Sequence, residues 1–190
     1  MQENKPKISG VKYWLDFVWE TLKIVIISLA IIIPIRYFLI QPFFVKGASM
    51  EPNFQDGDYL IIDEISYRFK TPERGDIIIF RYPLDPSQFF IKRVVGLPGE
   101  TVKIENGEII IQNKDGKGSI LNESKYLSDD DDYTAGNVEV NLGDEEYFVL
   151  GDNRQASSDS RKWGGVKRKF IIGQVWLRAW PFSRLKVLNN

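Results

Sequence analysis

The sequence is 190 residues long, carries a formal net charge of −1 and contains neither cysteine nor histidine. This length suits one modest domain with an appendage, and the near-neutral charge without a basic block gives no indication of a nucleic-acid partner. The missing residue types exclude thiol catalysis, disulfides, Cys/His zinc sites and a Ser-His-Asp triad. A hydrolase of this composition would use Ser or Thr activated by Lys, paired carboxylates, or a metal bound by carboxylates.

The N-terminal segment changes from polar to apolar at Leu22. Residues 22–42 reach the roughly 20-residue length of a membrane-spanning helix if Arg36 extends toward a lipid head group. We therefore predict a cytoplasmic segment at residues 1–21 and a transmembrane anchor at residues 22–42. Lysines precede the apolar run, so the positive-inside rule places the N-terminus in the cytoplasm and the rest of the chain outside.

A cleaved signal peptide is the alternative interpretation of this segment, because a basic start and an apolar core are typical of both. No small-x-small cleavage site follows the apolar core directly, and Pro42 with neighbouring aromatic residues stands there instead. These residues favour an uncleaved anchor.

Beyond Gly47 the sequence contains short β-rich runs, each bounded by turn residues. Asn106-Gly107 indicates a tight hairpin, and Leu97-Pro98-Gly99-Glu100 indicates a type II turn. The pattern predicts a mostly-β domain of coiled or barrel-like sheets at residues 43–190, behind a single N-terminal transmembrane helix. The predicted strands cover residues 59–66, 76–82, 89–95, 101–105, 108–112, 138–141, 146–150 and 171–179.

Residues 113–136 differ from these runs because they are rich in Asn, Asp, Gly, Ser and Lys. We predict a variable loop there, with the acidic run Asp129–Asp132 as a solvated part of it. The EF-hand pattern of calcium-binding loops is absent, so no metal is expected, and the sequence assigns no role to the acidic run.

Two separated residues, Ser49 and Lys92, could form a catalytic pair. Ser49 follows Gly47 and Ala48, where a serine is usually only a turn residue. Period-two alternation places Lys92 on an apolar strand face with Phe90. Such a lysine either extends to an edge or is buried. Burial that lowers its pKa by roughly 3 units, about 4 kcal/mol, would let it accept the Ser49 proton near neutral pH.

A polar cluster at residues 151–161 follows an apolar strand. Its acidic and basic side chains could form internal ion pairs, because buried charges must be paired. Ser157 in the same cluster offers a hydroxyl that could orient a lysine amine. The residues available for ion pairs are Asp152, Arg154, Asp159 and Arg161.

In this order, behind an N-terminal apolar segment, these motifs resemble the boxes of bacterial type I signal peptidases. Residues 49–52 (SMEP) match the nucleophile box, residues 74–80 the structural box, and residues 92–100 (KRVVGLPGE) the general-base box. Residues 151–161 (GDNRQASSDSR) match the last box, and the similarity covers most of residues 20–182.

The resemblance implies that Ser49 is the nucleophile and Lys92 the general base. It also implies that Ser157 hydrogen-bonds the Lys92 amine, and that Asp159 and Arg161 form a supporting ion pair. The implied activity is removal of signal peptides from exported preproteins, by an acyl-enzyme, after small residues of Ala-x-Ala type. Neither a cofactor nor a metal is implied.

The family's substrate segment adds as a strand between the chain before the nucleophile and the strand before the general base. Gly47 departs from many members, which carry a Ser there whose hydroxyl helps to form the oxyanion hole, so the second oxyanion donor stays open. Phe54 stands at the usual Leu and would narrow a pocket. The predicted substrate-binding residues are Val45, Gly47, Met50, Phe54, Phe90 and Ile91.

Two other functions are compatible with parts of the sequence. A membrane-tethered β-domain that binds peptides without catalysis would keep the fold, but would not need both Ser49 and Lys92. A self-cleaving repressor of the SOS type would need a DNA-binding domain, and the N-terminus is apolar instead. The expected partners are preproteins and the lipid bilayer. Plasma and thylakoid membranes fit equally, and the sequence indicates neither the preferred preproteins nor the oligomeric state.

Overall fold

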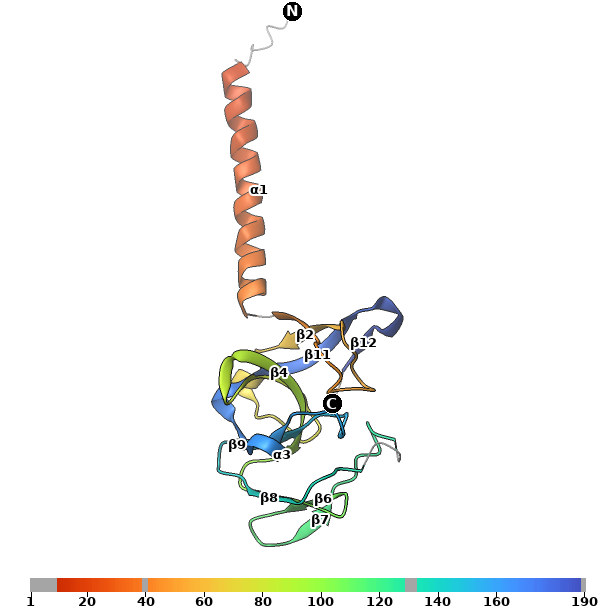
Figure 1. Ribbon diagram of the computed structural model, residues 1–190. Helices are drawn as coiled ribbons and strands as arrows, with labels where there is room; N and C mark the ends of the chain where they lie inside the picture. The colour runs from red at the N-terminus through yellow and green to blue at the C-terminus, as the bar shows by residue number, and fades with distance from the viewer. Residues whose placement is uncertain (1–9, 39–40, 129–132, 189–190) are drawn as a thin grey trace, which may run out of the picture. The chain divides into compact units, whose positions relative to one another are not determined.

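The computed structural model describes residues 10–38, 41–128 and 133–188 of the chain (Figure 1). The chain divides into two compact units, residues 1–39 and residues 40–190. The first unit contains one long helix, and the second contains all of the strands.

Helix α1 spans Gly10–Phe38. It begins well before the Leu22 that opens the predicted anchor, and residues 39 and 40 at the end of that anchor lie outside the described residues. Within the part of the chain that the structure describes, no helix has an apolar stretch sufficient to cross a membrane. The predicted segment boundaries at residues 21 and 42 therefore stay predictions.

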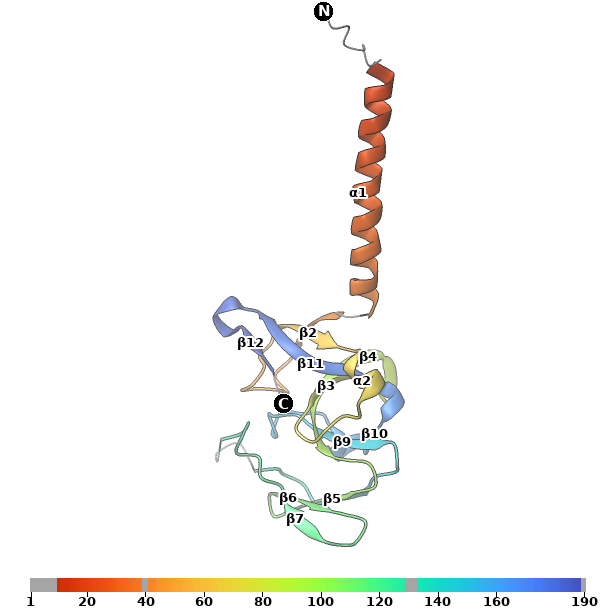
Figure 2. The same cartoon turned by 180° about the vertical axis from the view of Figure 1, so that it is seen from behind.

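The second unit is mostly β, as predicted, and its strands form two antiparallel sheets (Figures 1 and 2). The larger sheet has the order β1-β2-β11-β3-β4-β9-β10, with β12 paired to β11, and the smaller has the order β7-β6-β5-β8. The larger sheet contains β1 (Gln41–Phe44), β2 (Tyr59–Asp63), β3 (Ile77–Tyr82), β4 (Asp85–Gly96), β9 (Glu146–Leu150), β10 (Val166–Lys167), β11 (Ile171–Trp180) and β12 (Lys186–Val187). The smaller sheet contains β5 (Thr101–Glu105), β6 (Glu108–Gln112), β7 (Gly118–Ile120) and β8 (Val138–Asn141).

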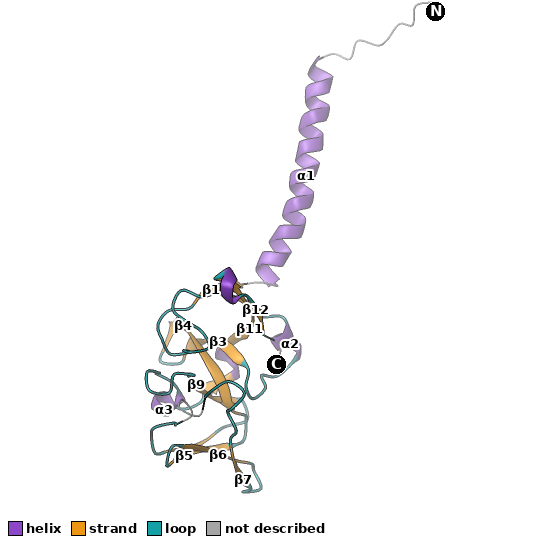
Figure 3. Ribbon diagram, turned by 90° about the vertical axis from the view of Figure 1, so that its right-hand side faces the viewer, coloured by secondary structure: helices purple, strands orange, loops and turns teal. Residues whose placement is uncertain are grey.

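The helical elements of this unit are short, and Figure 3 shows α2 and α3 on opposite sides of it. The α-helices are α2 (Ser66–Phe69) and α3 (Ser160–Trp163), and the 3₁₀ turns are η1 (Arg168–Phe170) and η2 (Phe182–Arg184). The strand predicted at residues 59–66 ends earlier, at Asp63, because helix α2 begins at Ser66. The carboxylate of Asp63 accepts hydrogen bonds from Ser66 N at 2.9 Å and Ser66 Oγ at 2.5 Å, so the chain turns away from the sheet.

Both predicted turns are present in the second unit. Asn106 and Gly107 have φ of 53° and 87°, the left-handed values that a two-residue hairpin turn requires. Gly99 has φ of 77°, and Glu100 N donates to Leu97 O at 3.2 Å, as in a type II turn.

Strand β4 contacts all three hydrophobic clusters of the β unit. Ile91 belongs to a cluster with residues from β1 to β3 and β11, Val94 to a second cluster and Val95 to a third, which includes the smaller sheet. Because strand side chains alternate between faces, Lys92 and Arg93 in the middle of β4 point to opposite sides, and both are buried.

The predicted loop at residues 113–136 is more structured than expected. It contains strand β7, and Glu123, Leu127 and Thr134 are buried. The acidic run at residues 129–132 lies outside the described residues. Much of this segment is therefore packed against the domain.

Candidate active site

Lys92 and Ser49 are in direct contact. Ser49 lies in the turn segment between β1 and β2, and Lys92 lies in β4 opposite Ile78 of β3. Lys92 Nζ is 2.8 Å from Ser49 Oγ and 2.8 Å from Ile91 O, and it lies 5.4 Å above the centre of the Phe90 ring. The structure thus brings together two residues that are 43 positions apart in the sequence.

The environment of Lys92 favours the neutral amine. The side chain is only 3% exposed, and no carboxylate of the described residues forms an ion pair with it. Burial lowers the pKa of Lys92 to about 8, although the more distant carboxylates of Asp159 and Asp152 oppose this shift. A substantial fraction of this lysine is therefore unprotonated in mildly alkaline solution.

The turn that carries Ser49 is fixed by its own backbone. Val45 N donates to Asp58 O at 2.9 Å, and Phe54 N donates to Met50 O at 2.8 Å. Gly47 has φ of 84°, and its N–H donates to Asp56 Oδ1 at 2.7 Å. These bonds close the turn on both sides of the serine.

Gly151 allows the polar cluster to approach Ser49 closely. Asn153 N donates to Ser49 O at 3.1 Å. A Cβ atom at Gly151 would lie 2.3 Å from that same carbonyl oxygen and 2.3 Å from Ser157 Oγ. Only glycine fits in this position without displacing the serine or the cluster.

On the side of β4 opposite to Lys92, an ion pair between Arg93 and Asp152 holds the start of the cluster. Arg93 Nε and Nη2 donate to the two Asp152 oxygens at 2.8 Å and 2.7 Å, and Arg93 Nη1 donates to Gly75 O at 2.9 Å. The guanidinium lies 3.9 Å from the centre of the Tyr126 ring. Asn53 Nδ2 adds a bond to Asp152 at 2.9 Å. All polar atoms of this buried carboxylate are therefore engaged.

A second buried ion pair joins the cluster to the loop at residues 113–136. Arg154 donates to both Glu123 oxygens, at 2.6 Å and 2.7 Å, to Gly151 O at 3.0 Å, and to Thr134 Oγ1. No sequence pattern indicated Glu123, because no local rule relates two residues that are 31 positions apart in the chain. The predicted variable loop thus contributes a buried partner to the site.

Asp159 and Arg161 form the third ion pair. Arg161 Nε and Nη2 lie 2.8 Å from the two Asp159 oxygens, and Gly151 N donates to Asp159 at 3.2 Å. Burial of Asp159 favours its protonated form, but Arg161, the nearby Ser157 hydroxyl and the Gly151 N–H together outweigh burial and lower the pKa of this carboxyl. Asp159 is consequently a fixed negative charge near Lys92.

The predicted hydrogen bond between Ser157 and Lys92 is not formed in this structure. Ser157 is 7% exposed, and its hydroxyl oxygen has no partner at normal hydrogen-bond geometry in the described part of the chain. The two bonds of Lys92 Nζ go to Ser49 and Ile91 instead.

A cavity of about 680 Å³ lies beside Ser49 and Lys92, between residues 43–49 and the first half of β4. Among the predicted substrate-binding residues, Val45, Gly47, Phe90 and Ile91 line it. Residues that the sequence did not indicate also line it: Phe43, Phe44, Leu60, Ile79, Gln88, Phe89, Ala156 and Ser158. The period-two pattern of β4 could have indicated Gln88, which shares a strand face with Lys92.

The structure does not bring Met50 and Phe54 to this cavity. They are 0% and 1% exposed and pack in the hydrophobic cluster that contains Ile91. The turn after Ser49 directs both side chains into the core, and Phe54 borders a different cavity. In the described residues, no group of three acidic side chains could hold a metal ion.

A serine hydroxyl hydrogen-bonded to a buried lysine beside a cavity, in a chain without histidine, is the arrangement of a serine-type hydrolase. The family model for signal peptidase, peptidase S26, matches residues 18–180. The chain therefore belongs to this family and is a serine-type endopeptidase.

Two relatives agree with this assignment, and one solved structure is also similar in sequence. The signal peptidase I of Leptolyngbya laminosa is 40% identical over 90% of this chain and 83% of its own length. The probable signal peptidase I-2 of Synechocystis sp. (strain ATCC 27184 / PCC 6803 / Kazusa) is 37% identical over 90% of this chain and 77% of its own length. A crystal structure of a signal peptidase I from Enterococcus faecalis V583 is 33% identical, covers 56% of this chain and 97% of its own, and gives a TM-score of 0.45.

We expect Asp152→Ala to destabilise the protein by about 3–5 kcal/mol, because it leaves the buried Arg93 guanidinium without its counter-charge. Glu105→Ala is the matched control, since it removes a carboxylate from a more exposed pair with Lys103 and should cost at most about 1 kcal/mol. Denaturant unfolding of both variants measures the difference. Equal losses of stability would contradict a structural role for the buried pair.

Proposed function

We propose that this protein removes signal peptides from exported preproteins with Ser49 as nucleophile and Lys92 as general base. The observation that supports this most directly is the 2.8 Å contact between Lys92 Nζ and Ser49 Oγ at the edge of a cavity. The lowered pKa of Lys92 adds to it, because only a neutral amine can accept the serine proton.

In the proposed mechanism, neutral Lys92 takes the Ser49 hydroxyl proton as Ser49 Oγ attacks the scissile carbonyl carbon. Protonated Lys92 then gives this proton to the leaving amine of the mature protein, and an acyl-enzyme on Ser49 remains. A water molecule deprotonated by Lys92 attacks the ester, releases the signal peptide and restores Ser49.

The Ser49 N–H is the proposed donor to the oxyanion of the tetrahedral intermediate. It makes no hydrogen bond within the described part of the chain. The Gly47 N–H is already bonded to Asp56. The Ser49 N–H is therefore available as a donor at the nucleophile itself, whereas the Gly47 N–H is not.

The substrate is proposed to bind as an added strand. Strand β4 pairs with β9 only from Arg93 to Gly96, so its residues before Arg93 have a partner only on the β3 side. Strand β1, on the other side of the cavity, is the end strand of the larger sheet. An extended peptide between these two segments can pair with the backbone of either one, and its carbonyl group would pass Ser49.

We propose cleavage after small residues of Ala-x-Ala type. The cavity wall near Ser49 includes the bulky side chains of Phe90 and Ile91, which leave room for a methyl group more readily than for a long side chain. Ser157, Asp159 and Arg161 are proposed to support the position of Lys92, through the shared contacts around Gly151.

Helix α1 is proposed to anchor the protein in a lipid bilayer, with the N-terminus in the cytoplasm and the β unit on the outer or lumenal side. The apolar side chains of α1 from Ile24 to Ile33 are exposed. No charged residue stands between Lys23 and Arg36, and a helical segment that is apolar on all sides is typical of burial in a membrane. The lysines before Leu22 favour this orientation.

The full chain in detergent should cut a preprotein with an Ala-x-Ala site directly after the second Ala. Ser49→Ala should abolish the cut, and Lys92→Ala should slow it by at least about 10²-fold because the general base is lost. The exposed Lys117→Ala serves as the control and should cleave normally. Mass spectrometry of the products locates the bond. Cleavage that survives in both variants would leave the non-catalytic, tethered peptide-binding domain as the better hypothesis.

The pH dependence of kcat/KM should follow the protonation of Lys92. Below its pKa of about 8 the lysine is protonated and inactive, so activity should rise with pH and level off above that value. Initial rates at constant ionic strength, measured on both sides of the midpoint, provide the profile. A rate that is independent of pH across this range would contradict a titrating lysine base.

Alkaline extraction of membranes should leave the full chain in the membrane fraction. The double variant Ile27→Asp/Ile31→Asp should shift it to the supernatant, because each acidic residue costs about 2.5–3.5 kcal/mol at the centre of a spanning helix. Ile27→Leu/Ile31→Leu is the size-matched control and should stay in the membrane fraction. Extraction of the unchanged chain would exclude α1 as an anchor.

A further inference from the structure

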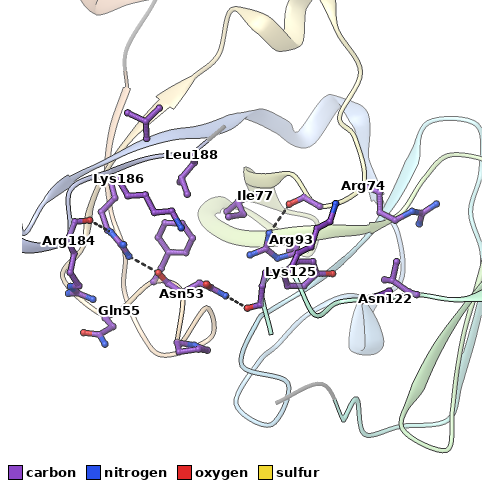
Figure 4. A pocket seen from close by; sticks show the side chains of 17 residues that line it. Asn53, Gln55, Arg74, Ile77, Arg93, Asn122, Lys125, Arg184, Lys186 and Leu188 are labelled. Carbon is purple, nitrogen blue, oxygen red and sulfur yellow. Dashed lines mark hydrogen bonds between the residues drawn. The ribbon is translucent and has the colours of Figure 1, made fainter. Parts of the chain in front are cut away.

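A second cavity of about 740 Å³ lies next to the turn that follows Ser49 (Figure 4). Its walls come from residues 52–55, residues 74–77, the loop at residues 121–126, and the C-terminal residues 184–188, with one residue each from β4 and β11. None of these residues lines the cavity beside Ser49 and Lys92. The second cavity is therefore separate from the proposed peptide site.

The lining of this cavity is strongly basic. No Asp or Glu occurs among its lining residues, whereas the cationic ones are Arg74, Arg93, Lys125, Arg178, Arg184 and Lys186. An anion would therefore be attracted to this cavity.

Three buried or partly buried carboxylates compensate only part of this charge. Glu100 pairs with Arg74 at 2.6 Å, and Asp152 pairs with Arg93 at 2.7 Å. Asp58 alone serves both remaining arginines, with Arg184 at 2.9 Å and Arg178 at 3.5 Å. Six cations thus face three carboxylate partners, which leaves a formal excess of three positive charges.

The donors without a partner come from two sides of the cavity. Lys186 extends from β12 and Lys125 from the loop opposite (Figure 4). Neither ammonium has a hydrogen bond or an ion pair with any residue that the structure describes. Arg178 is held in place by bonds to Asn53 O at 2.7 Å and Arg184 O at 2.8 Å. A fixed guanidinium and two available ammonium groups in the lining of one cavity are suited to an oxyanion with more than one negative charge.

We propose that this cavity binds a small phosphate-bearing molecule. A phosphate group matches the excess charge better than a single carboxylate does, because it carries nearly two negative charges and three acceptor oxygens. The apolar side chains of Phe54, Ile77 and Leu121 also line the cavity, and its volume exceeds that of a phosphate alone. The ligand is therefore an organic phosphate, either a soluble one or the head group of an anionic lipid.

This site does not depend on the proposed catalytic residues. Arg93 and Lys92 point to opposite sides of β4, and the cations that we assign to the ligand lie on the Arg93 side. A Ser49→Ala protein should bind the anion as the unchanged protein does. Loss of peptidase activity and loss of anion binding can consequently be observed separately.

Calorimetric titration of the full chain with inorganic pyrophosphate tests the proposal, first in nanodiscs of neutral phosphatidylcholine. Binding should be saturable and should weaken as salt is added. Lys125→Glu/Lys186→Glu should weaken it at least about tenfold, because two charge-assisted contacts are replaced by repulsion. Lys117→Glu makes the same kind of charge change at an exposed lysine outside the cavity and should leave the affinity unchanged.

A second titration, in nanodiscs that contain phosphatidylglycerol, identifies the source of the phosphate. Weaker pyrophosphate binding there would show that the lipid head group competes for the same cavity, and unchanged binding would show that the ligand is soluble. Absence of binding in neutral nanodiscs would overturn the proposal. An equal loss of affinity in Lys117→Glu would also overturn it, since binding would then follow net charge and not the cavity.

Discussion

The rest of the site depends on two consecutive buried basic side chains in β4. Alternation places Lys92 on one side of the strand and Arg93 on the other. A buried charge is costly unless it is paired or neutralised, and the chain uses both solutions. Arg93, which cannot lose its proton, is paired with Asp152 in a bidentate contact. Lys92 has no such partner, so its burial lowers its pKa instead.

The position of Ser49 depends on the same arrangement through a short chain of contacts. Asp152 is held by Arg93 and Asn53, and this places the neighbouring Gly151 and Asn153 against the Ser49 backbone. Arg154 then links the cluster to Glu123. The distance between serine and lysine is consequently set by ion pairs that touch neither reacting atom. Because these pairs are buried, a change in one of them affects both stability and geometry.

Local rules were sufficient for much of the β unit. Period-two alternation and turn residues predicted β5, β6, β8 and β9 with the bounds that the structure has. The same rule placed Lys92 and Arg93 on opposite faces. The short strands β1, β7, β10 and β12 were not predicted, because none of them forms an alternating run between turn residues, and each is defined by its pairing partner.

Within the site, the sequence did not predict where side chains in a turn point or which residues far apart in the chain form pairs. The turn after Ser49 buries Met50 and Phe54, and no periodicity applies inside a turn. The tertiary fold determines the pair of Glu123 with Arg154, so the polar composition of the loop did not indicate that Glu123 is buried. The resemblance to a family indicated the contact between Ser49 and Lys92 and the ion pair between Asp159 and Arg161. The partners of Arg93 and Arg154 are set by the tertiary fold, and no sequence pattern indicated them.

The turn at residues 49–55 connects the two cavities of the β unit. Ser49 at its start borders the cavity beside Lys92, and Asn53 further on borders the basic cavity. Asn53 uses its side chain to hold Asp152 and its carbonyl oxygen to hold Arg178. The positive charge of Arg93 is already balanced by Asp152. An anion in the basic cavity would therefore interact mainly with Arg178 and the unpaired lysines, and less with Arg93. This charge distribution allows the protein to keep a strongly basic cavity close to a lysine that must lose its proton.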